Sequence, residues 1–116
     1  MSITRIQVGP RMSQAVVHGN TVHLAGQVAA NPEGASVGAQ TRDILGRIDA
    51  LLAEAGSDRS KLLSATIYLT DIATFAEMNA EWDAWVVPGA TPARATVEAK
   101  LAAPAYRVEI AVIAAL

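Results

Sequence analysis

The C-terminal segment Val108–Leu116 is apolar at nearly every position, and Glu109 is its one charged residue. Successive side chains of a strand point to opposite faces of a sheet, so such a strand needs apolar cover on both faces. In a chain of 116 residues, helices can cover one of those faces. We therefore expect a second copy of the chain on the other face, and a homo-oligomer whose sheets form the interface.

Strand and helix patterns follow one another along the rest of the chain. A Gly-Asn pair between two β-branched runs indicates a tight hairpin, and an apolar stripe that ends at Gly56 indicates a helix. The predicted elements are a hairpin over 13–25, a helix over 37–55, a strand over 61–70, a helix that starts between 71 and 75 and ends by Pro88, and strands over 94–101 and 106–115. This ββαβαββ order predicts an α+β fold with one sheet and two helices on one face, in a single domain over residues 1–116.

Three local patterns refine this prediction. Thr70-Asp71 offers a helix N-cap, and Thr74 with Glu77 three residues later has the spacing of a capping box. Leu62-Leu63 predicts that the third strand is buried on both faces. Phe75, Met78, Trp82, Trp85 and Val86 predict the apolar face of the second helix.

Composition excludes several classes of function. The net charge of −2 gives no electrostatic attraction toward nucleic acid or anionic lipid. The chain has no cysteine, which excludes disulfides, thiolate metal sites and a cysteine nucleophile. No apolar run reaches the length of a membrane span, and the N-terminus lacks the apolar core of a signal peptide. We expect a cytoplasmic protein that binds neither membranes nor nucleic acid.

Arg94 is the first candidate for ligand contact. It stands at the start of an alternating strand just after Pro92, which blocks a preceding helix. A guanidinium held on rigid backbone can bind a carboxylate in a bidentate way that lysine cannot reproduce. The alternative is an ion pair at the surface or between subunits.

The other candidates carry weaker signals. Glu98 shares the face of Arg94 by its spacing, and Glu109 lies on the last strand, which we take to be the neighbour of the Arg94 strand; either could act as an acid or base. Asn79 on the second helix is either a structural hydrogen-bond partner or a pocket amide. His18 and His23 flank the hairpin turn, but a zinc site needs three or four protein ligands, and we expect no metal.

Taken in order along the chain, several short motifs resemble the RidA/YjgF family of reactive-intermediate deaminases. They span almost the whole chain: Leu24–Val28, Ala39–Thr41, Ala53–Gly56, Ala65–Asp71, Phe75–Asn79, Pro92–Arg94 and Val108–Ile110. Within the family, the chain most resembles the YoaB-type branch, because Arg11 and the segment Trp82–Val86 match that branch.

The resemblance implies a chorismate-mutase-like fold and a homotrimer, with a central β-barrel, the helices outside and ligand clefts between subunits. It implies hydrolysis of enamine or imine acids to a 2-oxo acid and ammonia, without metal or cofactor. By the family pattern Arg94 would bind the substrate carboxylate, and the backbone near Gly26 and the region of Asn79 would line the cleft.

The chain departs from the family pattern at four positions of that site. Ala111 stands where the family has the acidic residue thought to position water, and Ala25 replaces a serine. Arg11 replaces a tyrosine, and Thr96 stands where a cysteine is frequent. An alanine cannot transfer a proton, so the family mechanism does not carry over unchanged.

Two hypotheses follow from these departures. In the first, the protein is a trimeric hydrolase of imine or enamine acids, anchored by Arg94, with Glu109 as a weak substitute acid if it reaches the cleft. In the second, the same cleft binds a small carboxylate metabolite such as a 2-oxo acid without turnover, as a regulatory module. The ribonuclease activity attributed to similar proteins would need a basic surface that this acidic chain lacks.

Overall fold

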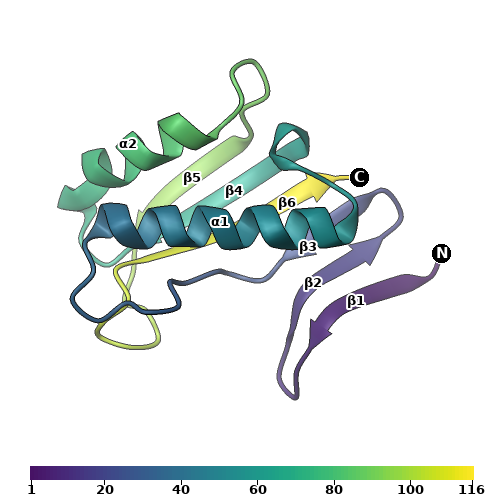
Figure 1. The fold of residues 1–116 in the computed structure, drawn as a ribbon, viewed down its shortest axis with the longest axis horizontal. Coiled ribbons are helices and arrows are strands. Elements are labelled where there is room, and N and C mark those ends of the chain that lie inside the picture. The colour runs from purple at the N-terminus through teal and green to yellow at the C-terminus, as the bar shows by residue number, and fades with distance from the viewer.

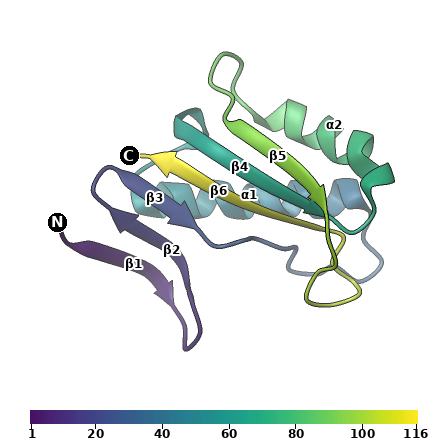
Figure 2. The same cartoon turned by 180° about the vertical axis from the view of Figure 1, so that it is seen from behind.

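The computed structural model describes all 116 residues, which form one six-stranded sheet with two α-helices. Figure 1 shows both helices in front of the sheet, and Figure 2, from behind, shows the sheet in front of them. The strands are β1 (Ile3–Val8), β2 (Ser13–His18), β3 (Thr21–Leu24), β4 (Leu62–Leu69), β5 (Ala93–Glu98) and β6 (Val108–Ala115). The helices are α1 (Val37–Ala55) and α2 (Phe75–Trp85), with short 3-10 turns η1 (Arg59–Lys61) and η2 (Ile72–Thr74).

The prediction of one sheet with two helices on one face is confirmed, and β1 adds a strand to the predicted order. β1 is absent from the predicted elements. Only Ile6 of its six side chains is buried, so buried and exposed residues do not alternate along this strand. The strands lie in the order β1-β2-β3-β6-β4-β5. β4 separates β6 from β5, so the prediction that the last two strands are neighbours is wrong.

The chemistry of the hairpin and of α1 places these elements as predicted. Gly19 has a φ of 62° in the turn between β2 and β3, a conformation that suits glycine. α1 ends at Gly56, with a φ of 88°, whose N–H donates to the carbonyls of the last turn. Ser36 caps its start by accepting from the N–H of Ala39 at 3.1 Å.

The start of α2 differs from the predicted capping box. The Thr74 hydroxyl donates to the carbonyl of Asp71, and the side chain of Asp71 accepts from the N–H of Ala73, so Asp71 caps η2. The Glu77 carboxylate instead accepts from the N–H of Gly38 at 2.8 Å, in the first turn of α1. Glu77 therefore supplies a negative group to the N-terminus of the neighbouring helix, where such a charge is stabilising.

The hydrophobic core lies between the helices and the sheet. α1 buries Ile44, Leu45, Ile48, Leu51 and Leu52 against alternate residues of β6. Full burial of each such aliphatic side chain contributes about 1.5–3 kcal/mol. Met78, Trp82 and Trp85 of α2 join the same core, as predicted.

The face of the sheet turned away from the helices is less covered in the single chain. On β6 the buried positions alternate with half-buried ones, and the latter carry Glu109, Ala111, Ile113 and Ala115. Leu63 of β4 is 50% exposed, so the predicted burial of β4 on both faces is not found within one chain.

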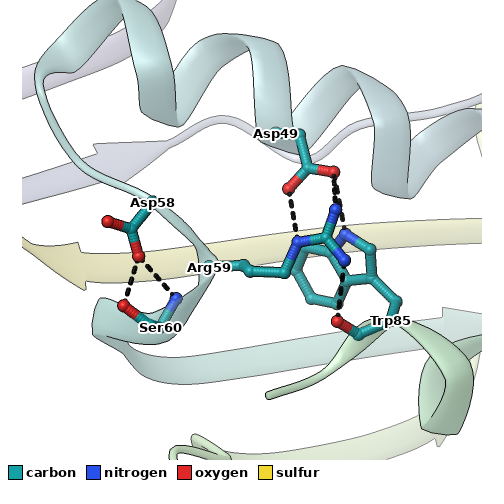
Figure 3. A network of polar contacts seen from close by, with 5 residues as sticks. All are labelled: Asp49, Asp58, Arg59, Ser60 and Trp85. Carbon is teal, nitrogen blue, oxygen red and sulfur yellow. Dashed lines mark hydrogen bonds and ion pairs between the residues drawn. The ribbon is translucent and has the colours of Figure 1, made fainter.

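A polar network ties α1, η1 and α2 together beside this core (Figure 3). Arg59 donates from Nε and Nη2 to the two carboxylate oxygens of Asp49, at 3.2 and 2.7 Å, and from Nη1 to the carbonyl of Trp85. The indole N–H of Trp85 donates to Asp49 at 3.0 Å, and the guanidinium lies 5.3 Å from the centroid of the indole ring. One arginine thus fixes the C-terminal end of α2 against α1.

No helix combines the length and the hydropathy that crossing a bilayer requires.

Candidate carboxylate-binding site

Arg94 faces α2 because of the register between β5 and β4. The two strands are parallel, with Arg94 opposite Ala65 and Thr96 opposite Ile67. Ala65 and Ile67 are buried beneath the helices, so Arg94 and Thr96 lie on the helix side of the sheet. Arg94 is half-buried.

Three side chains of α2 hold the Arg94 guanidinium. Nη1 donates to Oδ1 of Asn79 at 2.8 Å, and Cζ lies 5.4 Å from the ring centroid of Trp82 and 5.7 Å from that of Phe75. The three residues are spaced i, i+4 and i+7, which places them on one face of the helix. Aromatic faces attract a cation without neutralising its charge.

No carboxylate of the chain pairs with Arg94, since the ion pairs join Arg42 to Glu81 and Arg59 to Asp49. A guanidinium has five N–H donors, and the chain uses one of them. Arg94 is therefore a positioned cation with free donors, which is the arrangement that a bound carboxylate requires.

Thr96 and Glu98 complete the helix-facing side of β5. The hydroxyl oxygen of Thr96 is buried and has no hydrogen-bond partner in the chain. A buried hydroxyl without a partner is costly. This oxygen has almost no exposed surface through which a group outside the chain could reach it. The Glu98 carboxylate accepts from the N–H of Ile72 at 3.0 Å and is committed to holding η2.

Glu109 lies away from this cluster. It alternates with buried Val108 and Ile110, so it occupies the opposite face of the sheet, opposite Tyr68 of β4. Its carboxylate packs against Gly26, where a β-carbon would lie 2.9 Å from the Glu109 carboxyl carbon. Within one chain the structure does not bring Glu109 and Arg94 together.

The remaining candidates lie in two further places. Ala25 and Gly26 follow β3; the N–H of Ala25 donates to the carbonyl of Gln14, and the N–H of Gly26 donates to no group of the chain. Arg11 is exposed in the turn between β1 and β2, near the edge of the sheet opposite to β5. Four inter-strand spacings separate β2 from β5, roughly 19 Å.

His18 and His23 are both exposed on the hairpin, and no three His, Asp or Glu side chains gather as metal ligands would. Sequence analysis placed Phe75 in the apolar face of α2 and did not assign it to the site. Phe75 precedes Asn79 by four residues, so the two side chains share one face of α2. This spacing indicates a contact with Arg94 only once α2 is known to lie beside β5.

A family model described as Endoribonuclease L-PSP matches residues 2–116. The RutC family protein YoaB of Escherichia coli K12 is 46% identical over 118 residues and covers 100% of both chains. A RutC family protein of Haemophilus influenzae is 45% identical over 114 residues, covering 98% of each chain. The chain belongs to the RidA/YjgF family. Within it, the likeness to YoaB places the chain in the YoaB-like branch, as the sequence motifs indicated.

Solved structures of RidA/YjgF proteins share the fold. A YjgF-family protein of Neisseria meningitidis has a TM-score of 0.96 at 49% identity and covers 99% of this chain and 95% of its own. A YjgF-family member of Mycobacterium tuberculosis has a TM-score of 0.89 at 30% identity, covering 99% and 100%. The six-stranded sheet with two helices is therefore the fold of this family.

Proposed function

We propose that the protein is a homotrimer that binds small carboxylate metabolites, 2-imino or 2-oxo acids, in clefts between subunits. The observation that carries this proposal is the state of Arg94: its guanidinium is positioned by Asn79, rests on two aromatic rings and has no carboxylate partner. An anion that reaches it gains charge-assisted hydrogen bonds without displacing an internal ion pair.

The distribution of the candidate residues supports a cleft built by two subunits. Arg94 lies on the β5 edge of the sheet, and Arg11 lies in the turn that joins the two strands at the other edge. Gly26 follows β3, three inter-strand spacings from β5, and offers a free N–H. These groups join one site if the β5 edge of one copy meets the β1–β2 edge of the next, as closed rotational symmetry allows.

The uncovered sheet face supports the trimer for a separate reason. Ile113, Ala111 and Ala115 present small and aliphatic side chains on the side away from the helices. Three such faces turned inward would bury one another and form the central β-barrel, while the helices stay outside.

Hydrolysis of a 2-imino acid is the chemistry that this site would perform. Water adds to the carbon of the C=N bond, the nitrogen is protonated and leaves as ammonia, and a 2-oxo acid remains. Arg94 would hold the carboxylate beside that carbon. Catalysis would come from positioning and electrostatics, which suits a labile imine.

The second candidate function, binding without turnover, is favoured by the lack of acid–base groups at Arg94. Ala111 cannot move a proton, Glu98 is engaged by Ile72, and Glu109 lies on the other face of the sheet. The cleft would then serve as a metabolite-sensing site in the trimer.

Ribonuclease activity, which the family description names, is outside this proposal. With a net charge of −2 and a pI of about 5.6, the chain has no excess of basic residues with which to bind a phosphate backbone.

A single assay separates the two functions. 2-Iminopropionate and a bulkier 2-imino acid are generated in situ, and the release of 2-oxo acid is compared for the wild type, Arg94→Ala and Arg42→Ala. Arg42 is the matched control because it is an exposed arginine paired with Glu81. Acceleration by wild type and Arg42→Ala but not by Arg94→Ala supports hydrolysis. A rate equal to the spontaneous one in all three supports binding alone.

A further inference from the structure

A second polar cleft lies between α1 and the β1–β2 hairpin, far from Arg94. It has a volume of about 220 Å³ and is lined by Gln7, Gln14, Gln27, Arg47, Ala50 and Leu51. Within one chain Arg94 stands on β5 at the other edge of the sheet, and none of its contacts involves a residue that lines this cleft. Three glutamines line this one small cleft, beside a core made of apolar side chains.

Gln27 is fixed in orientation at the base of this cleft. The residue is 4% exposed, and its Nε2 donates to Oε1 of Gln14 at 2.9 Å and to the carbonyl of Ala25 at 3.0 Å. Both amide hydrogens are thus used, while Oε1 accepts from no group of the chain. Thr96 Oγ1 is the one fully enclosed side-chain atom without a partner, so Oε1 of Gln27 is reachable from the cleft.

Donors line the same cleft as this acceptor. Because Oε1 of Gln14 is taken by Gln27, the Nε2 group of Gln14 presents two N–H donors that no group of the chain accepts. Arg47 on α1 lines the same cleft, is exposed, and has no ion-pair partner. One side of the cleft therefore offers a cation and amide donors, and the base offers an acceptor.

Gln7 adds a strained backbone to this arrangement. It is the one non-glycine residue with a positive φ, 52°, and stands just before the last residue of β1. Ile6 faces the helices, so regular alternation would turn Gln7 away from them, yet its Nε2 donates to Glu54 on α1 at 3.0 Å. Strain of this kind persists where the surrounding structure holds a side chain in place for binding. Gln7, which lines the cleft, thereby contacts Glu54, which lies about two helical turns from Arg47 along α1.

We infer that this cleft binds a free α-amino acid. The carboxylate would accept from Arg47 and from Nε2 of Gln14, and the ammonium group would donate to Oε1 of Gln27, with Glu54 adding a favourable charge nearby. Ala50 and Leu51 provide the apolar wall for the aliphatic part of the ligand. The volume of about 220 Å³ is on the scale of one molecule of amino-acid size.

The test is a titration of the ¹⁵N-labelled full-length Arg94→Ala protein, in which the proposed carboxylate anchor is absent. L-alanine, L-glutamine and L-phenylalanine are added up to about 20 mM, with 2-oxobutanoate and propylamine as probes that lack one of the two groups. We expect at least one amino acid to shift the side-chain amide resonances of Gln14 and Gln27, and the two partial probes to shift them far less. Arg47→Gln in the same background should weaken that binding about tenfold or more, and Arg42→Gln should not.

Any of three results would overturn this inference; the last two concern the specificity of binding. The first is the absence of shifts at Gln14 and Gln27 with all three amino acids. The second is an equal response to 2-oxobutanoate, and the third is binding unchanged by Arg47→Gln. Arg47 is exposed and makes no hydrogen bond within the chain, so its replacement leaves the fold intact. Because Arg94 is already removed, failure here is separate from failure of the proposed function.

Discussion

Nη1 of Arg94 donates to Oδ1 of Asn79 at 2.8 Å, which joins β5 to α2 through one hydrogen bond. The partner is a neutral amide, so it orients the guanidinium and leaves the positive charge free for a ligand. A carboxylate in the same place would orient the arginine equally well and cancel its charge.

Replacing Asn79 with aspartate tests this distinction. Asn79→Asp should form an ion pair with Arg94 and reduce the affinity for a 2-oxo acid by about tenfold or more, since the ligand must compete with an internal anion. The stability of the fold should be unchanged or higher. Isothermal calorimetry with 2-oxobutanoate and thermal unfolding measure the two effects, and unchanged affinity would contradict the role assigned to Asn79.

The network of Asp49, Arg59 and Trp85 should carry measurable stability (Figure 3). Arg59→Ala removes three hydrogen bonds. It leaves the Trp85 carbonyl and Oδ1 of Asp49 without the hydrogen bond that Arg59 donates to each. We expect a loss of about 1–2 kcal/mol in the free energy of unfolding, measured by urea denaturation.

Arg42→Ala is the matched control for this experiment. Its ion pair with Glu81 is solvent-exposed, with 63% of the Arg42 side chain accessible, so its loss should cost about 0.5 kcal/mol or less. Equal losses for the two variants would show that the Arg59 network adds nothing beyond an ordinary surface pair.

Asp58 should titrate below its ordinary pKa of about 3.8. The hydroxyl and the backbone N–H of Ser60 both donate to its carboxylate, and these hydrogen bonds lower the pKa by favouring the charged form (Figure 3). The resulting stabilisation of η1 is present above the ordinary pKa and is lost as the pH falls through the lowered one. NMR titration should show that Ser60→Ala moves the pKa upward; an unchanged pKa would contradict this cause.

The sequence predicts α1 to its last residue because two independent signals agree there. The apolar stripe of Ile44, Ile48 and Leu52 has helical spacing, and Gly56 supplies the αL conformation that ends the helix. No such signals agree for β1, because Ile6 is the one residue of this strand that is buried within a single chain. The position of β4 between β6 and β5 depends on pairing between strands far apart in the sequence, which no local pattern predicts.

The sequence predicts which residues belong to the site but not which contacts they make. Arg94 and Asn79 were both named, because a proline-led strand and a polar residue on an apolar helix face are visible in the sequence. Their hydrogen bond depends on how α2 lies along β5. The face shared by Glu109, Ala111 and Ile113 follows from strand alternation, but only the packing of the helices decides that it is the face opposite to Arg94.

The trimer can be tested on the face of β6 that the helices leave open. The wild type should have a solution mass of about 36 kDa, three times the 12.1 kDa of one chain. Ile113→Asp places a charge on that face and should shift the mass toward one chain, because a buried unpaired charge is strongly unfavourable. Light scattering measures both, and a wild-type monomer would remove the basis for a cleft between subunits.

Calorimetric titration of 2-oxobutanoate into the wild type, Arg94→Lys and Arg94→Ala shows directly whether Arg94 binds the carboxylate. If Arg94 anchors the carboxylate, the wild type binds, Arg94→Lys binds at least about tenfold more weakly because it lacks the planar fork, and Arg94→Ala shows no heat of binding. Circular dichroism should show that all three proteins are folded. Equal affinity in the wild type and Arg94→Ala would contradict the assignment of this site.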